Sequence, residues 1–351
     1  MRWKFWQNIE TSEPEERATN FPGAGKMAGL ALLGITGYLL LVVGLTWWWD
    51  KEPASFAVQE NAANAARTKN DTLVTGYMTT ATLIRLGETL LDKRGGYLSN
   101  DLFPPGVWMD NIPNWEFGVL TLIRDTARVY RNDLSRSQSQ SVEDKELSEA
   151  EGKFFFDNAS WILPRTEDEY RSGLRLFNAY LARLTDSGQT NAQFYARADN
   201  LQQLLATIET RLGSLSQRLS ASVGKRQLNT DLAGDSAAQQ ATRAPKDQLV
   251  KTSWFEIDDV FYETRGFTWG LLHLLQAIEQ DFGDVLDKKN ARVSLQQIIR
   301  ELEPSQDTLW SPVVLNGNGL GLLANHSLVM ASYIARANAA IIDLRTLLTQ
   351  G

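Results

Sequence analysis

One apolar stretch stands out from the hydrophobic and polar pattern of this chain. Residues 27–49 read MAGLALLGITGYLLLVVGLTWWW and contain no charged side chain. At a helical rise of about 1.5 Å per residue, this length crosses a hydrocarbon core of about 30 Å. A buried core helix would carry a polar face, and the apolar region of a cleaved signal peptide would be shorter, at about 7 to 15 residues. The stretch therefore predicts a transmembrane helix.

The flanks of this stretch predict where the membrane surface lies and how the helix is oriented. Trp47, Trp48 and Trp49 have amphipathic rings that favour the headgroup layer, so they mark a membrane interface. Basic residues are slightly more numerous before the helix than just after it, which favours a cytoplasmic N-terminus. The expected organisation is a cytoplasmic tail (1–26), a transmembrane helix (27–49) and a large domain outside the cytoplasm (50–351).

Helical periodicity predominates beyond the apolar stretch. Apolar positions recur at steps of three and four, and few runs alternate with period two, so the predicted class is all-α. Thr166 and Glu169 form a capping-box pattern at the start of one helix. The expected helices are 58–93, 115–134, 166–184, 194–219, 252–282, 291–303 and 325–349.

The helix expected at 194–219 has the clearest periodicity. Its apolar residues repeat as a heptad seam, which is typical of a long helix that packs at a shallow angle against a partner. The partner can be within the chain or in another copy; the short turn at 186–190 favours an antiparallel hairpin with the preceding helix. The seam consists of Phe194, Ala198, Leu201, Leu205, Ile208, Leu212, Leu215 and Leu219.

Two irregular segments are candidate interaction or pocket loops. Residues 97–118 combine three prolines with many aromatic and aliphatic residues, which favours a packed loop over disorder. Residues 309–327 contain the spacing GxGxG, at Gly317, Gly319 and Gly321, ahead of a helix; we interpret these glycines as turn formers because the strand of a nucleotide fold is missing. Polar runs near 135–152 and 220–251 are interpreted as linkers. The candidate residues of the two loops are Trp108, Asn111, Asn114, Trp115, Asn316, Asn325 and His326.

Candidate chemistry is sparse. The chain has no cysteine and only two histidines, so a metal site and a cofactor are not expected. His273 lies in an apolar run and is interpreted as a hydrogen-bonded core residue, whereas His326 is interpreted as part of a helix cap. The acidic groups at 256–263 and 281–287 are interpreted as solvated helix faces, although paired acids can cleave glycosidic bonds.

The net charge argues against one class of partner. The formal charge of the chain is -7, and the basic and acidic side chains of residues 1–26 cancel, so the excess negative charge belongs to the later residues. A nucleic-acid-binding domain needs a basic surface, and none is expected here.

Several sequence segments resemble those of an uncharacterised proteobacterial family of membrane-anchored proteins, which is classed as a domain of unknown function. They are GGYLSND (95–101), DNIPNWEFG (110–118), RNDLSRSQSQS (131–141), LGSLSQRLSAS (212–222), LWSPVVLNGNG (309–319) and ANHSLVMASYIARANAAIIDL (324–344). The resemblance implies an inner-membrane protein of a Gram-negative envelope, with its bulk in the periplasm, and implies no activity.

The leading hypothesis is an envelope adaptor or scaffold, with an envelope protein or a second copy as partner and membrane lipid around one helix. Gly25 and Gly29 form a GxxxG at the edge of the apolar stretch, and Gly34, Gly37 and Gly44 share a face within it, which adds helix pairing as a means of self-association. The alternatives are a periplasmic enzyme acting on cell wall or lipid, with His326 as a candidate, and a carrier of lipid or a small ligand.

Overall fold

The computed structural model describes residues 24–69, 71–137, 142–188, 191–228, 247–311, 313–317 and 322–350. The chain divides into two compact units, residues 1–45 and residues 46–351. Among the described residues, helices account for nearly all regular structure, so the all-α prediction is confirmed.

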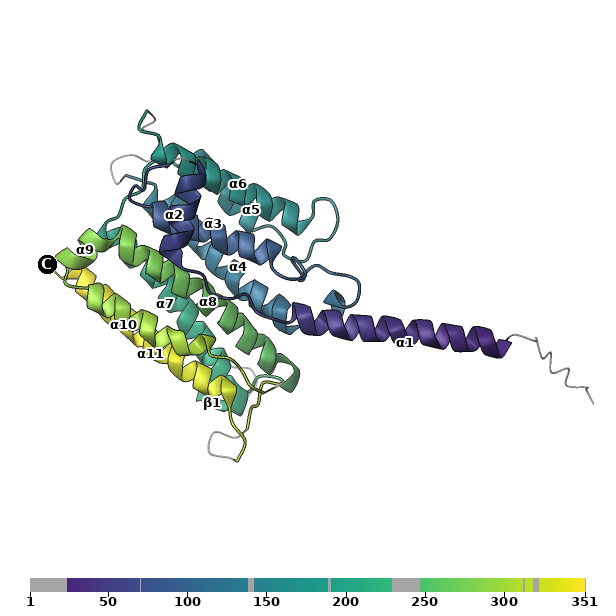
Figure 1. The fold of residues 1–351 in the computed structure, drawn as a ribbon. Helices are drawn as coiled ribbons and strands as arrows, with labels where there is room; N and C mark the ends of the chain where they lie inside the picture. Colours follow the sequence, from purple (N-terminus) through teal and green to yellow (C-terminus); the bar gives the residue numbers. More distant parts are fainter. Residues whose placement is uncertain are drawn as a thin grey trace, which may run out of the picture. The chain divides into compact units, whose positions relative to one another are not determined.

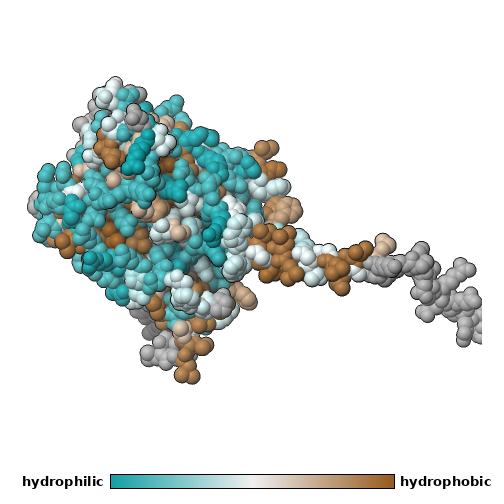
Figure 2. Space-filling model, in the orientation of Figure 1, coloured by the Kyte–Doolittle hydropathy of each residue, from teal (hydrophilic) through white to brown (hydrophobic). Residues whose placement is uncertain are grey.

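Helix α1, Ala24–Trp49, contains the predicted apolar stretch. Over residues 29–41 its side chains are exposed, and Figure 2 shows its described part as apolar or neutral in colour. By length and composition, Gly29–Trp49 could span a membrane. A second helix, His326–Thr349, passes the same test, but a stripe of its side chains is buried in the helical domain.

The helices of the second unit form two groups that meet at α4 and α8 (Figure 1). One group contains α2, α3, α5 and α6, and the other contains α7, α10 and α11. Short turns of other helical types cover 106–108, 130–134, 221–223, 254–256 and 303–306. The bounds are α2 Val58–Lys69, α3 Tyr77–Asp92, α4 Asn111–Val129, α5 Lys145–Phe154, α6 Thr166–Thr185, α7 Ala198–Ser220, α8 Ile257–Asp281, α9 Gly283–Lys288, α10 Arg292–Leu302 and α11 His326–Thr349.

The crossing of α4 and α8 depends on glycine. A Cβ atom at Gly266 would lie 1.9 Å from the carbonyl oxygen of Trp115, and one at Gly118 would lie 2.0 Å from that of Glu263. The two backbones therefore touch where a side chain would keep them apart. Gly266 lies within the helix expected at 252–282, and the lack of a side chain at this position permits the close crossing.

The heptad seam of α7 is buried within the chain, as expected, but its partner differs from the prediction. Leu201, Leu205, Ile208, Leu212 and Leu215 are buried, and α7 packs mainly along α11 instead of forming a hairpin with α6. An apolar stripe packs against any complementary stripe, so a short turn alone does not select the neighbour. Among the small residues of α11, Ala331 and Ala337 are buried, whereas Ser332, Ala335 and Ala339 are exposed.

The single helix expected over 58–93 is in fact two helices, α2 and α3. The break is stabilised by Asp281, whose carboxylate accepts hydrogen bonds from the backbone N–H groups of Gly76 (2.9 Å) and Thr79 (2.7 Å) and from the Thr79 hydroxyl (2.6 Å). Gly76 has φ +91°, a conformation that glycine adopts without strain. The partly buried Asp281 thus caps α3, and its assignment to a solvated face was wrong.

Both predicted linkers contain regular structure. Within 135–152, Asp144 caps α5 by accepting from the backbone N–H of Leu147 at 3.2 Å, and Leu147, Ala150 and Phe154 are buried. Within 220–251, strands β1 (Lys225–Leu228) and β2 (Asp247–Val250) pair antiparallel. The polar composition of these runs gave no sign of regular structure. Helix α5 has only a narrow apolar stripe, and the strands β1 and β2 are short. Residues 138–141 and 229–246 lie outside the described residues.

Two further details of the helix predictions need correction. The Thr166 hydroxyl donates to the carbonyl oxygens of Asp157 (2.8 Å) and Ser160 (3.0 Å), so it does not cap α6, which begins after Arg165. The helix expected at 252–282 begins later, at Ile257, and Trp254 is exposed in the turn before α8.

Candidate functional site

The end of α1 and the segment after it, residues 49–56, contact the rest of the helical domain at three points. Trp49 packs against the apolar cluster of Leu98, Met109 and Ile112. Glu52 forms an ion pair with Arg265 of α8. Farther along, the backbone N–H of Phe56 donates to a buried histidine of the same helix. The segment 49–56 is therefore an ordered part of the domain.

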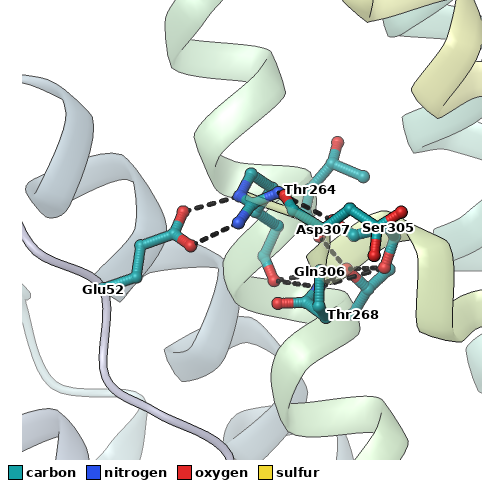
Figure 3. A network of polar contacts seen from close by, with 7 residues as sticks. Glu52, Thr264, Thr268, Ser305, Gln306 and Asp307 are labelled. Carbon is teal, nitrogen blue, oxygen red and sulfur yellow. Dashed lines mark hydrogen bonds and ion pairs between the residues drawn. The ribbon is translucent and has the colours of Figure 1, made fainter. Parts of the chain in front are cut away.

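Arg265 of α8 hydrogen-bonds to three of the residues that Figure 3 labels, Glu52, Ser305 and Asp307. Its Nε and Nη2 atoms donate to the two carboxylate oxygens of Glu52 at 2.7 and 2.6 Å, a bidentate geometry. Its Nη1 atom donates to the carbonyl oxygens of Ser305 and Asp307, both at 2.9 Å. One buried guanidinium thus links the segment after α1, helix α8 and the turn after α10.

We expect that Glu52→Ala detaches this segment locally while the domain stays folded. Arg265 would keep its two carbonyl acceptors but lose its counter-charge, at a cost of about 2 kcal/mol. Limited proteolysis of the detergent-solubilised full chain should show new cleavage within residues 50–57. Glu60→Ala, an exposed carboxylate in the next helix, is the matched control and should cleave like the parent. Unchanged cleavage in both variants would contradict the role given to Glu52.

His273 is the core histidine that the sequence predicted. Its Nε2 atom accepts the Phe56 N–H at 3.0 Å, so the proton lies on Nδ1, which donates to the Trp269 carbonyl at 2.7 Å. The Phe56 ring stacks on the imidazole with centroids 4.0 Å apart. Burial lowers the pKa of His273 to about 4, which keeps the ring neutral and able to accept.

The irregular segment between α3 and α4 is organised by Glu116, a fully buried carboxylate. It pairs with Lys93 and accepts from the backbone N–H groups of Leu98 (2.8 Å) and Ser99 (2.9 Å) and from the Ser99 hydroxyl. Glu116 is not among the candidate residues predicted from the sequence. Its spacing from Ile112 and Ile123, which places all three on the buried face of α4, was the available signal.

The four candidates of the first loop lie in different surroundings. Trp108 is exposed, and Asn111 begins α4, where its backbone N–H donates to Asp110 at 2.9 Å. Asn114 donates to Asp259 at 2.7 Å. Trp115 is fully buried against Trp269, with ring centroids 5.1 Å apart. Pro113 is tolerated in the helix because N–H groups of the first turn need no helical acceptor.

A hollow of about 650 Å³ opens beside Asn114. Glu263, fully paired with Arg218 at 2.7 and 2.6 Å, forms part of its wall. Asp259 faces the same space; burial, together with repulsion from Asp258, Asp110, Glu256 and Glu263, raises its pKa to about 6. The acidic run at 256–263 is thus only partly a solvated face. The hollow is also lined by Gln217, Lys251 and Thr252.

The raised pKa of Asp259 predicts a pH-dependent gain in stability for Asp259→Asn. Because the folded-state pKa lies above the unfolded value, this group favours folding below about pH 4, and that contribution is lost as the pH rises through about 6. The amide keeps the acceptor for Asn114 without the charge. At pH 7 the gain should be about 1 kcal/mol after solvent screening. It should vanish near pH 4 in urea titrations, and Asp343→Asn, an exposed carboxylate in α11, should show neither effect.

The second loop forms a separate hollow of about 290 Å³, lined by His326, Trp310, Phe261 and Tyr333. His326 accepts the backbone N–H of Leu315 at 3.0 Å through Nδ1. Burial lowers the pKa of His326, so the imidazole stays in its accepting form. The histidine therefore joins the start of α11 to the backbone of residue 315 within the second loop.

Two asparagines complete this loop. Asn325 caps α11 by accepting the Leu328 N–H at 2.9 Å, and it donates to the Gly317 carbonyl at 2.6 Å. Asn316 pairs with Asn325 in a single antiparallel bridge. The predicted cap is thus Asn325 rather than His326. Gly319 and Gly321 lie outside the described residues.

The described side chains include no group of three or more His, Asp or Glu residues placed to hold a metal ion. A model of a bacterial protein family described as uncharacterised matches residues 24–351. Neither curated proteins nor solved structures give a match.

Proposed function

The chain belongs to the DUF2333 family, uncharacterised proteins conserved in bacteria, and we propose that it is a single-pass envelope adaptor. In this proposal α1 crosses the inner membrane with its N-terminus in the cytoplasm. Residues 50–351 lie in the periplasm and bind an envelope protein or a second copy of the chain. Membrane lipid surrounds α1, and nucleic acid is excluded by the net charge of -7.

The observation that carries the proposal is the attachment of residues 49–56 to the domain. A free tether samples many conformations, whereas the ion pair of Glu52 with Arg265 and the bond from Phe56 to His273 order the residues that follow Trp49. Such an attachment suits a protein that presents a partner at a defined distance from the membrane surface.

Two experiments on the full chain test the proposal. A carboxyl-terminal alkaline phosphatase, which is active only outside the cytoplasm, should be active when fused to residue 351; activity from a cytoplasmic reporter instead would reject the topology. Crosslinking in intact membranes should capture a stoichiometric envelope partner or a homo-oligomer. A monodisperse, uncrosslinked monomer would reject the adaptor role.

The hollow beside Asp259 supports a second candidate, binding or turnover of a small ligand from cell wall or lipid. A carboxyl group with a pKa of about 6 can exchange a proton near neutral pH. Incubation of the solubilised full chain with peptidoglycan and lipid extracts tests this role. Turnover that is lost in Asp259→Asn would favour it over the adaptor, whereas unchanged extracts would remove it. His326→Ala tests the second hollow in the same assay.

A further inference from the structure

Two loops of the helical domain expose large apolar side chains beside the end of α1. The first, residues 102–108, exposes Phe103 (77%) and Trp108 (62%), and the second, residues 161–163, exposes Trp161 (51%) and Leu163 (91%). Side chains of this size are rarely left in water in such number unless they contact another surface. We name residues 102–108 and 161–163 the apolar rim.

Hydrogen bonds join the bases of the two loops. The Tyr97 hydroxyl donates to the Asn158 carbonyl at 2.9 Å. The Asn100 amide donates to the Ser160 carbonyl at 2.9 Å and to the Glu167 carboxylate at 2.8 Å. The loops therefore form one surface, although sixty residues separate them in sequence.

Trp49 fixes where this surface lies along the chain. Its ring packs against Leu98, Met109 and Ile112, the residues that flank the first loop. A Cβ atom on Gly95 would come within 2.8 Å of the same ring. Trp49 ends the apolar helix, and tryptophans at such positions occupy the headgroup layer. The apolar rim is thus held beside the residues that mark the membrane interface.

We propose that the apolar rim inserts into the headgroup and upper acyl region of the bilayer that α1 crosses. The inference rests on the membrane anchorage in the proposed function. Tryptophan, phenylalanine and leucine are the residues that enter this region most readily. The charged residues that flank the two loops are Asp101, Asp110, Asp157 and Arg165, and Arg165 pairs with Asp168. Attraction to anionic lipids therefore contributes little, and insertion depends on apolar burial.

The absence of cysteine from the chain allows site-specific labelling to test this proposal. Phe103→Cys and Leu163→Cys report on the rim. Val293→Cys, a 73% exposed position on α10, is the matched control, and Leu39→Cys in α1 reports on the anchor. Each full-chain variant would carry a polarity-sensitive fluorophore in vesicles of phosphatidylethanolamine and phosphatidylglycerol, and would be quenched by nitroxide lipids or by aqueous iodide.

The expected result is several-fold stronger nitroxide quenching at 103 and 163 than at 293, with the reverse order for iodide. Added salt or a lower phosphatidylglycerol fraction should leave this pattern unchanged. Iodide quenching at 103 and 163 equal to that at 293 would overturn the proposal, as would protection from both quenchers, which would indicate a protein covering. Nitroxide quenching at position 39 alone would reject insertion of the apolar rim and retain the membrane anchorage by α1. Absence of nitroxide quenching at position 39 would reject the anchorage itself.

Discussion

Gly266→Ala should unfold the helical domain at markedly lower denaturant concentration than the parent chain. The added methyl group would lie 1.9 Å from the Trp115 carbonyl oxygen, and backbone atoms cannot move aside as a flexible side chain can. Helices α4 and α8 must separate, which also opens the packing of Trp115 on Trp269. We expect a loss of about 3 kcal/mol or more. Gly118→Ala should behave alike, because its methyl group would meet the Glu263 carbonyl from the other helix.

Urea titration of the solubilised full chain, followed by far-ultraviolet circular dichroism, measures this effect. Gly152→Ala is the matched control because nothing lies within 4 Å of its added Cβ atom. Alanine favours an exposed helix by about 1 kcal/mol over glycine, so that variant should be as stable as the parent or slightly more so. Equal stability of Gly266→Ala and Gly152→Ala would mean that the close crossing is not formed in solution.

Glu116→Ala should produce the second large loss, about 3 to 5 kcal/mol. The substitution leaves the Lys93 ammonium group, only 3% exposed, without its counter-charge, and it removes the acceptor of two backbone N–H groups. The loop that packs against Trp49 would lose its internal support. Glu116→Gln keeps an acceptor oxygen and should lose less.

The control for this prediction is the exposed ion pair of Lys145 and Glu149, whose atoms are 3.9 Å apart. Glu149→Ala should change the free energy of unfolding by less than about 1 kcal/mol, since solvent screens that pair. Both variants lose an ion pair, but only Glu116→Ala leaves a buried charge unpaired. Comparing their free energies of unfolding therefore separates the effect of burial from that of charge pairing. A loss at Glu116 no greater than that at Glu149 would show that the carboxylate is hydrated in the folded protein.

The attachment of residues 49–56 and the apolar rim would act together in an envelope adaptor. The first orders residues 49–56 against the domain through polar bonds to α8, and the second would add contacts to the bilayer. A partner bound elsewhere on the domain would then meet a surface with a limited range of orientations. This arrangement lowers the entropy lost on binding, because fewer orientations remain to be excluded.

The sequence by itself determined the helical class, the apolar helix and most helix positions. These depend on local spacing: side chains three or four residues apart share a face, so a buried stripe such as that of α7 is visible without knowledge of its partner. His273 was also identifiable as a core residue because its neighbours in the chain are apolar. The polar composition of residues 135–152 led to the prediction of a linker, although this run contains a short amphipathic helix, α5.

Only the tertiary structure decided which stripes meet and which charges are buried. The partner of α7 is α11, and the partners of Glu52 and Phe56 lie more than 200 positions away on α8. Asp281 and Glu116 look like ordinary surface carboxylates until the N–H groups that they accept from are placed around them. Apolar burial is non-directional and does not specify partners, whereas hydrogen bonds and ion pairs specify them only once the chain has brought distant segments within about 3 Å.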